Sequence, residues 1–318
     1  MKVLTLRIRF LTPAFLGDAE QKSAWRTPPF KAQLRQWWRI EKAAERLSWE
    51  EIRRLEGELF GHARPDGKPR RSQVRLRLDR WRPGQARPFE QPLLKQTKKS
   101  ESPAPEYLAY GPFSQRRPAI DAGDGAELRL AVPEERRPEL ERVLGLMHRF
   151  GTVGSSSRNG WGAYALEDAP EIPLERYLID WREALEESWV RGIGKDEQGP
   201  LIWRTSEGYD RWHEAMKTLA ELRKKVNSVS TQADLRCLVS YPVTKMRQQG
   251  WRNSDRLPGT LRFKVLKQGE QYYGQAVHLP CRPNDDMFRR AKLSRDQLWH
   301  LWRNVHRLLD GKMQRVAA

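Results

Sequence analysis

The sequence has little cysteine, no long hydrophobic run and a shortage of acidic residues. Its 318 residues include only Cys237 and Cys281, and neither lies in a Cys-x-x-Cys or His-x-x-x-His spacing, so no zinc site or disulfide framework is predicted. No segment approaches the ~20 apolar residues of a membrane span, and residues 1–10 lack the apolar run of a signal peptide. We therefore expect a cytoplasmic protein with no metal site and no other cofactor.

The charged residues are strongly unbalanced towards the basic side. The chain has 59 Lys and Arg against 41 Asp and Glu, a formal net charge of +18, and such an excess repels itself unless an anionic partner offsets it. Arginine is the commoner cation, and guanidinium both binds phosphate bidentately and stacks on bases. RNA is therefore the expected partner, with a network of internal ion pairs as the structural alternative.

Hydrophobic patterning in the first half predicts alternating strands and helices. Apolar and polar residues alternate over residues 1–10, a helical spacing follows Pro28 and Pro29, and Gly61 is a typical helix stop. The predicted strands are residues 1–10, 74–78, 128–132 and 161–166, and the predicted helices are residues 30–40, a segment ending at Gly61, and residues 134–150. The order β-α-β-β-α-β predicts an α+β, ferredoxin-like domain with an antiparallel sheet. Residues 82–106 are expected to form a mobile loop.

Three of these strands carry arginines on the face opposite their apolar residues. The arginines are Arg7 and Arg9 in the first strand, Arg75 and Arg77 in the second, and Arg129 in the third. On any single strand, charged side chains are typical of a solvated face that prevents aggregation. That interpretation is favoured for each strand taken alone.

The second half predicts a second domain at residues 169–318, after the first at residues 1–168; no repeat of the first domain is evident, although two degenerate ferredoxin-like units would hide one. Helices are expected at residues 174–190 and 209–226, and a hairpin at residues 261–279 that turns at 268–270. A last helix begins at Ser294, with Gln297 at capping-box spacing. This helix is expected to bury Leu298, Leu301, Trp302, Val305 and Leu308.

The stretch from Gly151 to Gly162 combines four glycines and three serines between a helix end and a strand start. A dinucleotide fold or a phosphate loop needs the reverse order, with the glycines between a strand and a helix, so both are rejected. Glycine allows close approach of the backbone N–H groups to phosphate, whereas a helix stop with a turn is the structural alternative. The residues expected to contact RNA are Gly151, Gly154, Ser155, Ser156, Ser157, Arg158, Asn159, Gly160, Trp161 and Gly162.

This stretch, Gly151-Thr-Val-Gly-Ser-Ser-Ser-Arg-Asn-Gly-Trp-Gly162, resembles the glycine-rich loop of RAMP proteins, the repeat-associated RNA-binding components of CRISPR systems. Residues 11–17, 26–39 and 107–111 are similar to the family of first-numbered Cmr subunits of type III-B effector complexes. One departure is Ala32, where RAMP helices of this type commonly carry glycine.

The resemblance implies two tandem ferredoxin-like domains in a subunit that assembles with other Cmr subunits. It also implies contact with CRISPR RNA or target RNA, a role in antiviral defence, and no nuclease activity in this subunit.

Cations gather around the start of the first predicted helix. Arg26, Lys31, Arg35 and Arg39 recur there, where the helix N-terminus also favours phosphate, so we expect them to bind RNA. A solvated helix face is the alternative for each residue alone. The adjacent Trp37 and Trp38 are expected in the core.

Two other functional classes stay open. The first is a RAMP-type endoribonuclease that processes guide RNA or cuts target RNA, for which Asp18 and His62 are the candidate catalytic residues. Aspartate is also frequent in loops for turn geometry, and a lone loop histidine is usually only exposed. His148, His213, His300 and His306 lie on predicted helices and are interpreted as surface or packing residues. The second class is a structural scaffold without RNA contact.

Overall fold

The computed structural model describes residues 1–20, 22–63, 68–80, 105–109, 111–112, 115, 117–240 and 259–317. The chain divides into two compact units: unit 1 is Met1–Leu93 with Ala109–Tyr177, and unit 2 is Leu94–Leu108 with Leu178–Ala318. The predicted domain division at residue 168 stays a prediction. Most of the predicted mobile loop lies outside the described residues, and its end forms the 3-10 helix η2 (Pro105–Ala109).

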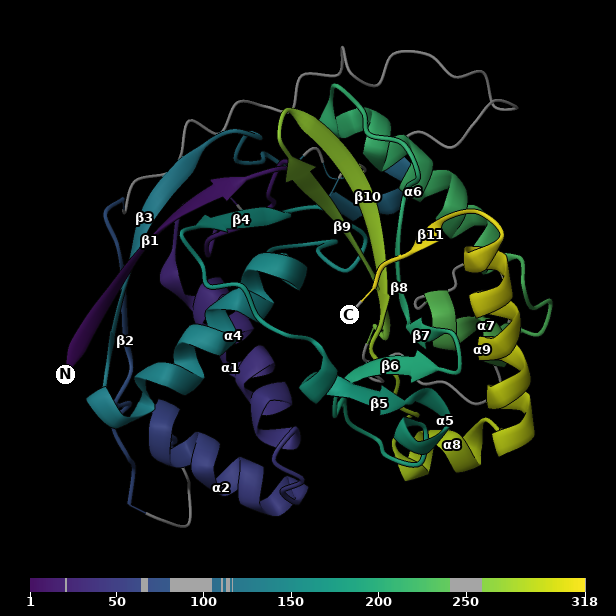
Figure 1. Ribbon diagram of the computed structural model, residues 1–318, viewed down its shortest axis with the longest axis horizontal. Helices are drawn as coiled ribbons and strands as arrows, with labels where there is room; N and C mark the ends of the chain where they lie inside the picture. The colour runs from purple at the N-terminus through teal and green to yellow at the C-terminus, as the bar shows by residue number, and fades with distance from the viewer. Residues whose placement is uncertain are drawn as a thin grey trace. The chain divides into compact units, whose positions relative to one another are not determined.

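Unit 1 has one four-stranded antiparallel sheet. Its strands are β1 (Lys2–Phe10), β2 (Arg75–Leu78), β3 (Gly125–Val132) and β4 (Tyr164–Glu167), in the order β2-β3-β1-β4. The helices α1 (Thr27–Ala43) and α4 (Arg137–Phe150) pack together on one face (Figure 1). This order confirms the predicted ferredoxin-like arrangement.

Local signals set the helix boundaries in unit 1. Prolines occupy the first positions of α1, where the missing N–H costs no hydrogen bond. The helix α2 (Trp49–Phe60) begins with a capping box between Ser48 and Glu51, and Gly61 follows its last residue at φ 77°. The helix predicted at residues 134–150 is shorter than expected, because residues 134–136 form the 3-10 helix η3 (Glu134–Arg136) and α4 begins at Arg137. The last strand starts at Tyr164 rather than at Trp161.

Aromatic side chains fill the space between the sheet and helices of unit 1. Trp37 and Trp38 are 0% and 1% exposed, which confirms their predicted core position. The Trp37 ring stacks on Phe150 at 5.5 Å, and the Trp38 ring meets Phe60 edge-on at 5.6 Å. Such pairs add about 0.5–1.5 kcal/mol each beyond area burial.

A buried carboxylate also ties the helices of unit 1 together. Glu41 on α1 is fully buried and accepts two hydrogen bonds from Arg142 on α4, at 2.9 and 2.6 Å, and one from the Tyr177 hydroxyl at 2.6 Å. Burial and the Glu41 carboxylate both raise the pKa of Tyr177, so this phenol stays a donor. Arg176 also lies 3.1 Å from this carboxylate, and loss of any one of the three partners would leave the buried charge less well compensated.

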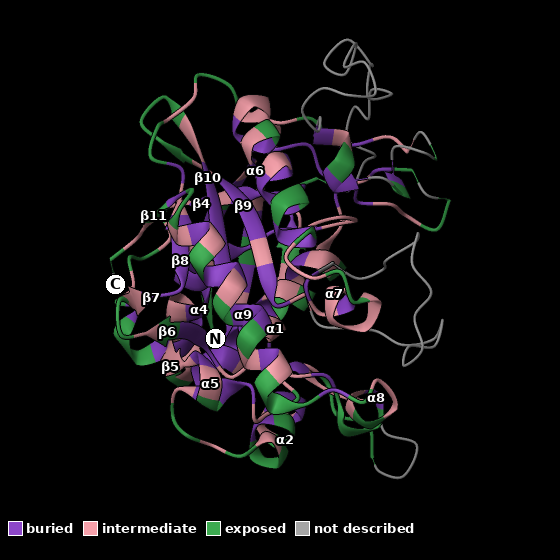
Figure 2. Cartoon of the chain, turned by 90° about the vertical axis from the view of Figure 1, so that its right-hand side faces the viewer, coloured by how far each residue is buried: buried purple, intermediate pink, exposed green. Residues whose placement is uncertain are grey.

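Unit 2 repeats the strand order of unit 1. Its main sheet has the antiparallel order β11-β8-β10-β9, and Figure 2 shows β10 mostly as buried. In chain order these elements are β8 (Ile202–Arg204), α6 (Trp212–Asn227), α7 (Ala233–Ser240), β9 (Leu261–Gln268), β10 (Gln271–His278), α8 (Asp285–Arg290), α9 (Arg295–Asp310) and β11 (Gln314–Arg315). With α6 and α9 as the two main helices, this is again β-α-β-β-α-β, so the tandem fold is confirmed.

The predicted helix at residues 174–190 is wrong. The segment forms η4 (Glu175–Tyr177), β5 (Leu178–Asp180) and the four-residue helix α5 (Trp181–Ala184), and β5 pairs in parallel with β6 (Ile193–Asp196), which in turn pairs with β7 (Gly199–Pro200). Asp180 starts α5 by accepting a hydrogen bond from the Arg182 N–H at 2.8 Å. The apolar residues of this segment have a helical spacing, but η4, β5 and α5 bury them in succession instead of one helix.

The last helix follows the prediction except at one position. The capping box of Ser294 and Gln297 is present, and four of the five predicted apolar residues are buried. Leu308 is only half-buried, and Leu309 takes its place in the core. None of the helices within the described residues is long and apolar enough to cross a membrane. The expected cytoplasmic location stays a prediction.

Two histidines form a hydrogen-bonded pair inside unit 2. His278 and His306 are 0% and 4% exposed, and their Nδ1 and Nε2 atoms lie 3.0 Å apart. The Trp302 ring stacks on His278 at 3.9 Å, and the Trp181 ring meets His306 edge-on at 5.1 Å. Burial lowers the pKa of both imidazoles, that of His306 to about 3. The charged groups that influence His306 are Asp196, Asp310, Arg315 and Arg182.

We expect acid to destabilise unit 2 through this pair. The folded state keeps both imidazoles neutral, whereas the unfolded chain takes up protons below its ordinary pKa of 6.5. The pair's contribution is therefore complete above pH 6.5, and each histidine lowers the free energy of unfolding by about 1.4 kcal/mol per pH unit below it. Urea titrations between pH 7.5 and pH 5 measure this slope. The His278→Gln/His306→Gln variant should flatten it, and the surface control His300→Gln should not; an unchanged slope in the double variant would contradict the assignment.

Candidate nucleic-acid interface

The glycine-rich loop at residues 151–162 connects α4 to β4 and lies against the segment that follows β1. The N–H of Gly162 donates to the carbonyl of Pro13 at 2.9 Å, and the N–H of Ser155 donates to that of Phe15 at 3.0 Å. The loop is therefore fixed on the same short segment of unit 1 at Ser155 and again at its last residue, Gly162.

Thr12 adds a buried side-chain connection to the same loop. Its hydroxyl donates to the carbonyl of Gly160 at 2.8 Å and accepts from the N–H of Ala163 at 2.9 Å. Trp161 is fully buried, and its ring lies 5.3 Å from that of Phe15. The Trp161 ring is thus a packing element of the loop, and no face of it is exposed for stacking on a base.

The glycines give this loop its close fit to the rest of unit 1. Gly162 has φ +62°, and a Cβ there would collide with the carbonyl oxygen of Val153. Gly154 has φ +91°, and a Cβ there would lie 2.7 Å from the carbonyl oxygen of Phe15. Side chains are strained at such φ values. The glycine backbone at these positions faces the protein's own chain, in agreement with the structural alternative of a stop and a turn.

The middle of the loop is its accessible part, and we name residues 155–159 the crest. Ser155, Ser156, Ser157 and Asn159 are half-buried, and Arg158 is exposed. Two turn-like hydrogen bonds shape the crest, from the Asn159 N–H to the Ser156 carbonyl at 2.9 Å and from the Gly160 N–H to the Ser157 carbonyl at 3.2 Å. Surrounding protein displaces part of the water around Arg158 and lowers the pKa of its guanidinium, which stays charged at neutral pH.

Two of the four cations predicted around the start of α1 form ion pairs within unit 1. Arg35 Nε lies 2.6 Å from Glu56 Oε1, and Arg39 makes two hydrogen bonds of 2.8 Å to the same carboxylate. Glu56 is buried on α2. Burial alone would raise the pKa of Glu56, but the hydrogen bonds from Arg39 and Arg35 hold it below its ordinary value. The two arginines therefore clamp α1 to α2, and each side chain is still more than a third exposed.

The other two cations are placed differently. Arg26 Nη1 donates to the carbonyl of Gly17 at 2.8 Å, only two residues beyond Phe15, which holds the crest. Lys31 is half-buried and makes no hydrogen bond or ion pair with any residue that the structure describes. Burial and the nearby Arg35 charge lower the pKa of Lys31. Arg26 and the crest are thus both held by residues 13–17, whereas Arg35 and Arg39 bind Glu56 on α2. The RNA contacts of all these residues stay predictions.

The two catalytic candidates also have local roles. Asp18 Oδ1 accepts from the N–H groups of Glu20 and Lys22 at 2.9 and 2.8 Å, which closes a turn. His62 pairs through its backbone with Arg70, and its ring packs on Gly57. In the part of the chain that is described, no group of three or more His, Cys, Asp or Glu could hold a metal ion.

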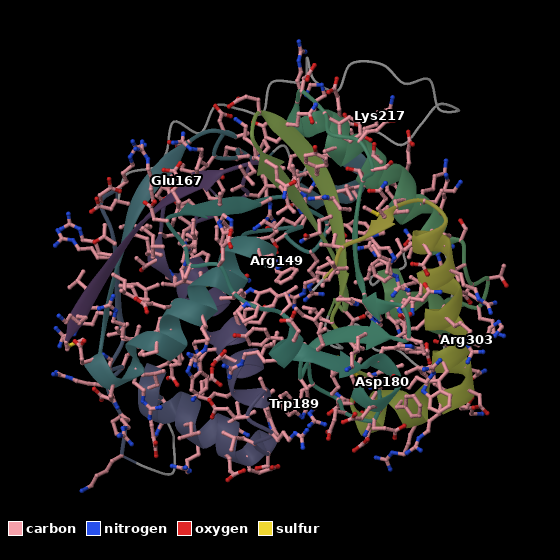
Figure 3. The ribbon with its side chains drawn as sticks, viewed as in Figure 1. Arg149, Glu167, Asp180, Trp189, Lys217 and Arg303 are labelled. Atoms are coloured by element: carbon pink, nitrogen blue, oxygen red, sulfur yellow. The ribbon has the colours of Figure 1, made fainter. Side chains whose placement is uncertain are left out.

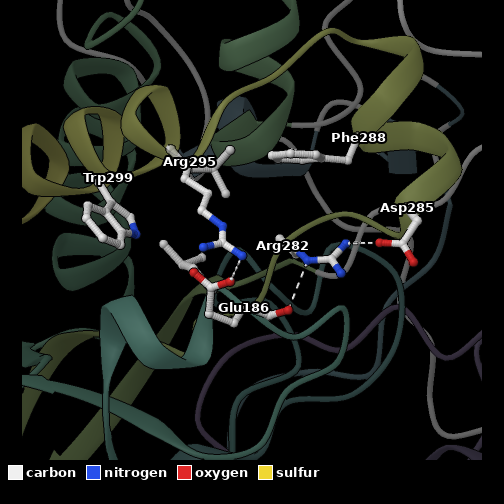
Figure 4. A pocket seen from close by; sticks show the side chains of 8 residues that line it. Glu186, Arg282, Asp285, Phe288, Arg295 and Trp299 are labelled. Carbon is white, nitrogen blue, oxygen red and sulfur yellow. Dashed lines mark hydrogen bonds and ion pairs between the residues drawn. The ribbon is translucent and has the colours of Figure 1, made fainter.

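Unit 2 contains a pocket of about 230 Å³ that no sequence pattern indicated (Figure 4). Its lining combines aromatic rings with arginines, namely Phe288, Trp299, Arg282 and Arg295. Arg295 forms an ion pair of 2.5 Å with Glu186, and Arg282 forms one of 2.5 Å with Asp285. Since both guanidiniums are neutralised by neighbours and the volume is below the ~300 Å³ of common ligand sites, we assign the pocket no ligand.

Comparison with protein families places this arrangement in a known class. Residues 7–165 match the RAMP superfamily, which is half of the chain, so the protein belongs to that superfamily. Its fold is shared with a particular member, Cmr1 from Pyrococcus furiosus, whose apo crystal structure matches with a TM-score of 0.51 at 17% identity over 87% of this chain and 88% of that chain. A chain in the cryo-EM structure of the Type III-B Cmr-beta bound to cognate target RNA matches with a TM-score of 0.47 at 10% identity, over 95% of this chain and 99% of that chain. A comparison with curated proteins finds no match.

We expect Gly162→Ala to destabilise unit 1 by about 2 kcal/mol or more, because the new Cβ meets the Val153 carbonyl at a φ that side chains rarely adopt. The matched control is Gly311→Ala, in the loop of unit 2 that also joins the last helix to the last strand. There φ is −78°, and the nearest atom would be at an ordinary 3.5 Å, so the change should stay below about 1 kcal/mol. Urea unfolding of both variants measures the difference; equal effects would contradict the packing role of Gly162.

Proposed function

We propose that this protein is a non-catalytic RNA-binding subunit of a type III-B CRISPR effector complex, with CRISPR RNA or target RNA and other Cmr subunits as partners. The observation that carries the proposal is the crest, which presents the exposed Arg158 on a loop fixed by backbone hydrogen bonds. Membership of the RAMP superfamily and the fold shared with Cmr1 support it.

The chemistry of the crest fits a phosphate chain. Three serine hydroxyls and one asparagine amide offer neutral donors beside the charged guanidinium, and a fixed loop loses little conformational freedom when it binds. The net charge of +18 adds long-range attraction for a polyanion. Such contacts position RNA by its backbone and carry little sequence information.

A RAMP-type endoribonuclease is the alternative function. It would need a general base or acid within reach of the reacting ribose and phosphate. The Asp18 carboxylate already accepts two backbone hydrogen bonds in its own turn, and the His62 ring packs on α2. These local roles favour binding over cleavage.

We therefore expect the purified protein to leave a single-stranded RNA intact, with or without divalent metal. The RNA is incubated with the protein for several hours and separated on a denaturing gel, beside a ladder made by alkaline hydrolysis of the same RNA. Product bands that appear with the wild-type chain and vanish in Asp18→Ala or His62→Ala would establish the endoribonuclease instead.

We expect Arg158→Ala to weaken RNA binding by roughly 1.5–3 kcal/mol, the range for hydrogen bonds to charged groups. The wild-type chain should show a slope near −4 of log K against log salt if about six phosphates are neutralised, and the variant a shallower slope. The control Arg53→Ala removes an exposed arginine of α2 and should change neither property much. A large fall in the melting temperature of Arg158→Ala, with RNA binding intact in the cold, would make Arg158 an internal brace.

A further inference from the structure

The face of the unit 1 sheet that points away from α1 and α4 is charged and open. In β1, Leu6, Ile8 and Phe10 are buried, and the intervening residues lie on the opposite side. The side chains of Arg7 and Arg129 on that side are 64% and 59% exposed. We name this the outer sheet face, and its charged residues are Arg7 and Arg9 on β1, Arg75 and Arg77 on β2, Glu127 and Arg129 on β3, and Glu167 on β4 (Glu167 is labelled in Figure 3).

Strand register joins these residues into one patch. The middle strands β1 and β3 lie side by side, with β2 next to β3. Arg77 stands directly opposite Arg129, and Thr5 stands opposite Arg129 on the other side. Like charges at directly opposed positions destabilise a sheet, so the Arg77 and Arg129 pairing works against stability in the isolated chain.

The acidic residues of the patch neutralise only part of its charge. Glu127 lies 2.5 Å from Arg129, and Glu167 lies 2.7 Å from Arg9 and 3.8 Å from Arg7. Arg75 and Arg77 are exposed and form no hydrogen bond or ion pair with a residue inside the described ranges. Five arginines thus lie with two glutamates on the outward positions of the four strands, and just after β2 the carboxylate of Asp79 accepts a hydrogen bond from the Glu127 N–H at 2.9 Å.

Protection against aggregation accounts for only some of these residues. Arginine on the edge strand β2 blocks pairing with another sheet, but Arg7, Arg9 and Arg129 lie on the two central strands, where no edge is exposed. An internal ion-pair network would leave no surplus of arginines. A surplus shared by three neighbouring strands is complementary to an anion that spans them.

We propose that the outer sheet face binds the phosphate backbone of single-stranded RNA, which crosses β1, β3 and β2. This inference rests on the proposed function and adds a second contact surface to the crest. The outward positions of the four strands carry no aromatic residue, so the bases have no ring to stack on there. Recognition therefore runs through bidentate guanidinium contacts to phosphate and is independent of sequence.

The test compares two variants that each remove three positive charges. The first is Arg75→Ala/Arg77→Ala/Arg129→Ala, on the outer sheet face. The control is Arg53→Ala/Lys217→Ala/Arg303→Ala, exposed cations on α2, α6 and α9 (Lys217 and Arg303 are labelled in Figure 3). Both are titrated with a fluorescent oligouridylate at several salt concentrations. The outer-face variant should bind roughly tenfold to a hundredfold more weakly near 0.1 M salt, with a slope shallower by about 2, and the control should keep the wild-type slope.

A charge-conserving variant and the melting temperature guard against a folding artefact. Arg75→Lys/Arg77→Lys/Arg129→Lys should keep most of the salt slope, since the charges stay. The alanine variant should melt at the wild-type temperature or above it, because the opposed charges of Arg77 and Arg129 are gone. The alanine variant could instead aggregate, while its monomeric fraction binds RNA as tightly as the control variant does. In that case the arginines serve to prevent aggregation of the sheet, and the inference is wrong.

Arg158→Ala, measured in the same titration, separates this inference from the proposed function. If Arg158→Ala weakens binding and the outer-face variant matches the control, the crest binds RNA and the outer sheet face does not. If the wild-type chain binds no RNA at low salt, the proposed function and the inference both fail. If the outer-face variant binds RNA normally but no longer assembles with other Cmr subunits, the face docks a protein, which also overturns the inference.

Discussion

The contact between the glycine-rich loop and residues 11–15 is the constraint on which unit 1 depends. The carbonyls of Pro13 and Phe15 accept from the loop backbone, and Gly162 allows this because it has no Cβ to meet Val153. The same contact joins the end of β1, the end of α4 and the start of β4. One of the two central strands of the sheet, one of its two main helices and its last strand therefore meet at one place.

Much of unit 1 could be predicted because its signals are local. The alternation in β1, the paired prolines before α1 and the glycine after α2 each act within a few residues. Their order then leaves few possible topologies. The helix predicted at residues 174–190 failed for the opposite reason. There the strand β5 is stabilised by pairing with β6, a partner more than ten residues away that the apolar spacing does not reveal.

The place of the glycine-rich loop in the chain could be predicted, whereas the contacts that its residues and the nearby cations make could not. Composition and order located the loop, whereas the direction of each group depends on contacts with distant segments. Arg35 and Arg39 were predicted to face RNA because they are cations on a helix, and nothing nearby in the sequence indicates that Glu56 is buried between them. The repeat of the strand order in unit 2 was expected from the family resemblance and not from a pattern in the residues, because the loop between α9 and β11 is only residues 311–313. Unit 2 has the same strand order as unit 1 but lacks a glycine-rich loop before its last strand.

The anchoring of the glycine-rich loop through its backbone has a consequence for its diversity. The hydrogen bonds to Pro13 and Phe15 start from the backbone, and those of Thr12 involve the backbone of Gly160 and Ala163, so no side chain of residues 156–159 takes part in them. Side-chain changes at positions 157–159 therefore leave these anchoring bonds in place, whereas Ser156, at φ 58°, favours a small residue or asparagine. The contacts that fix the loop therefore place few demands on the side chains of the crest. It is also the place in unit 1 where a reporter group or a short foreign peptide could be inserted.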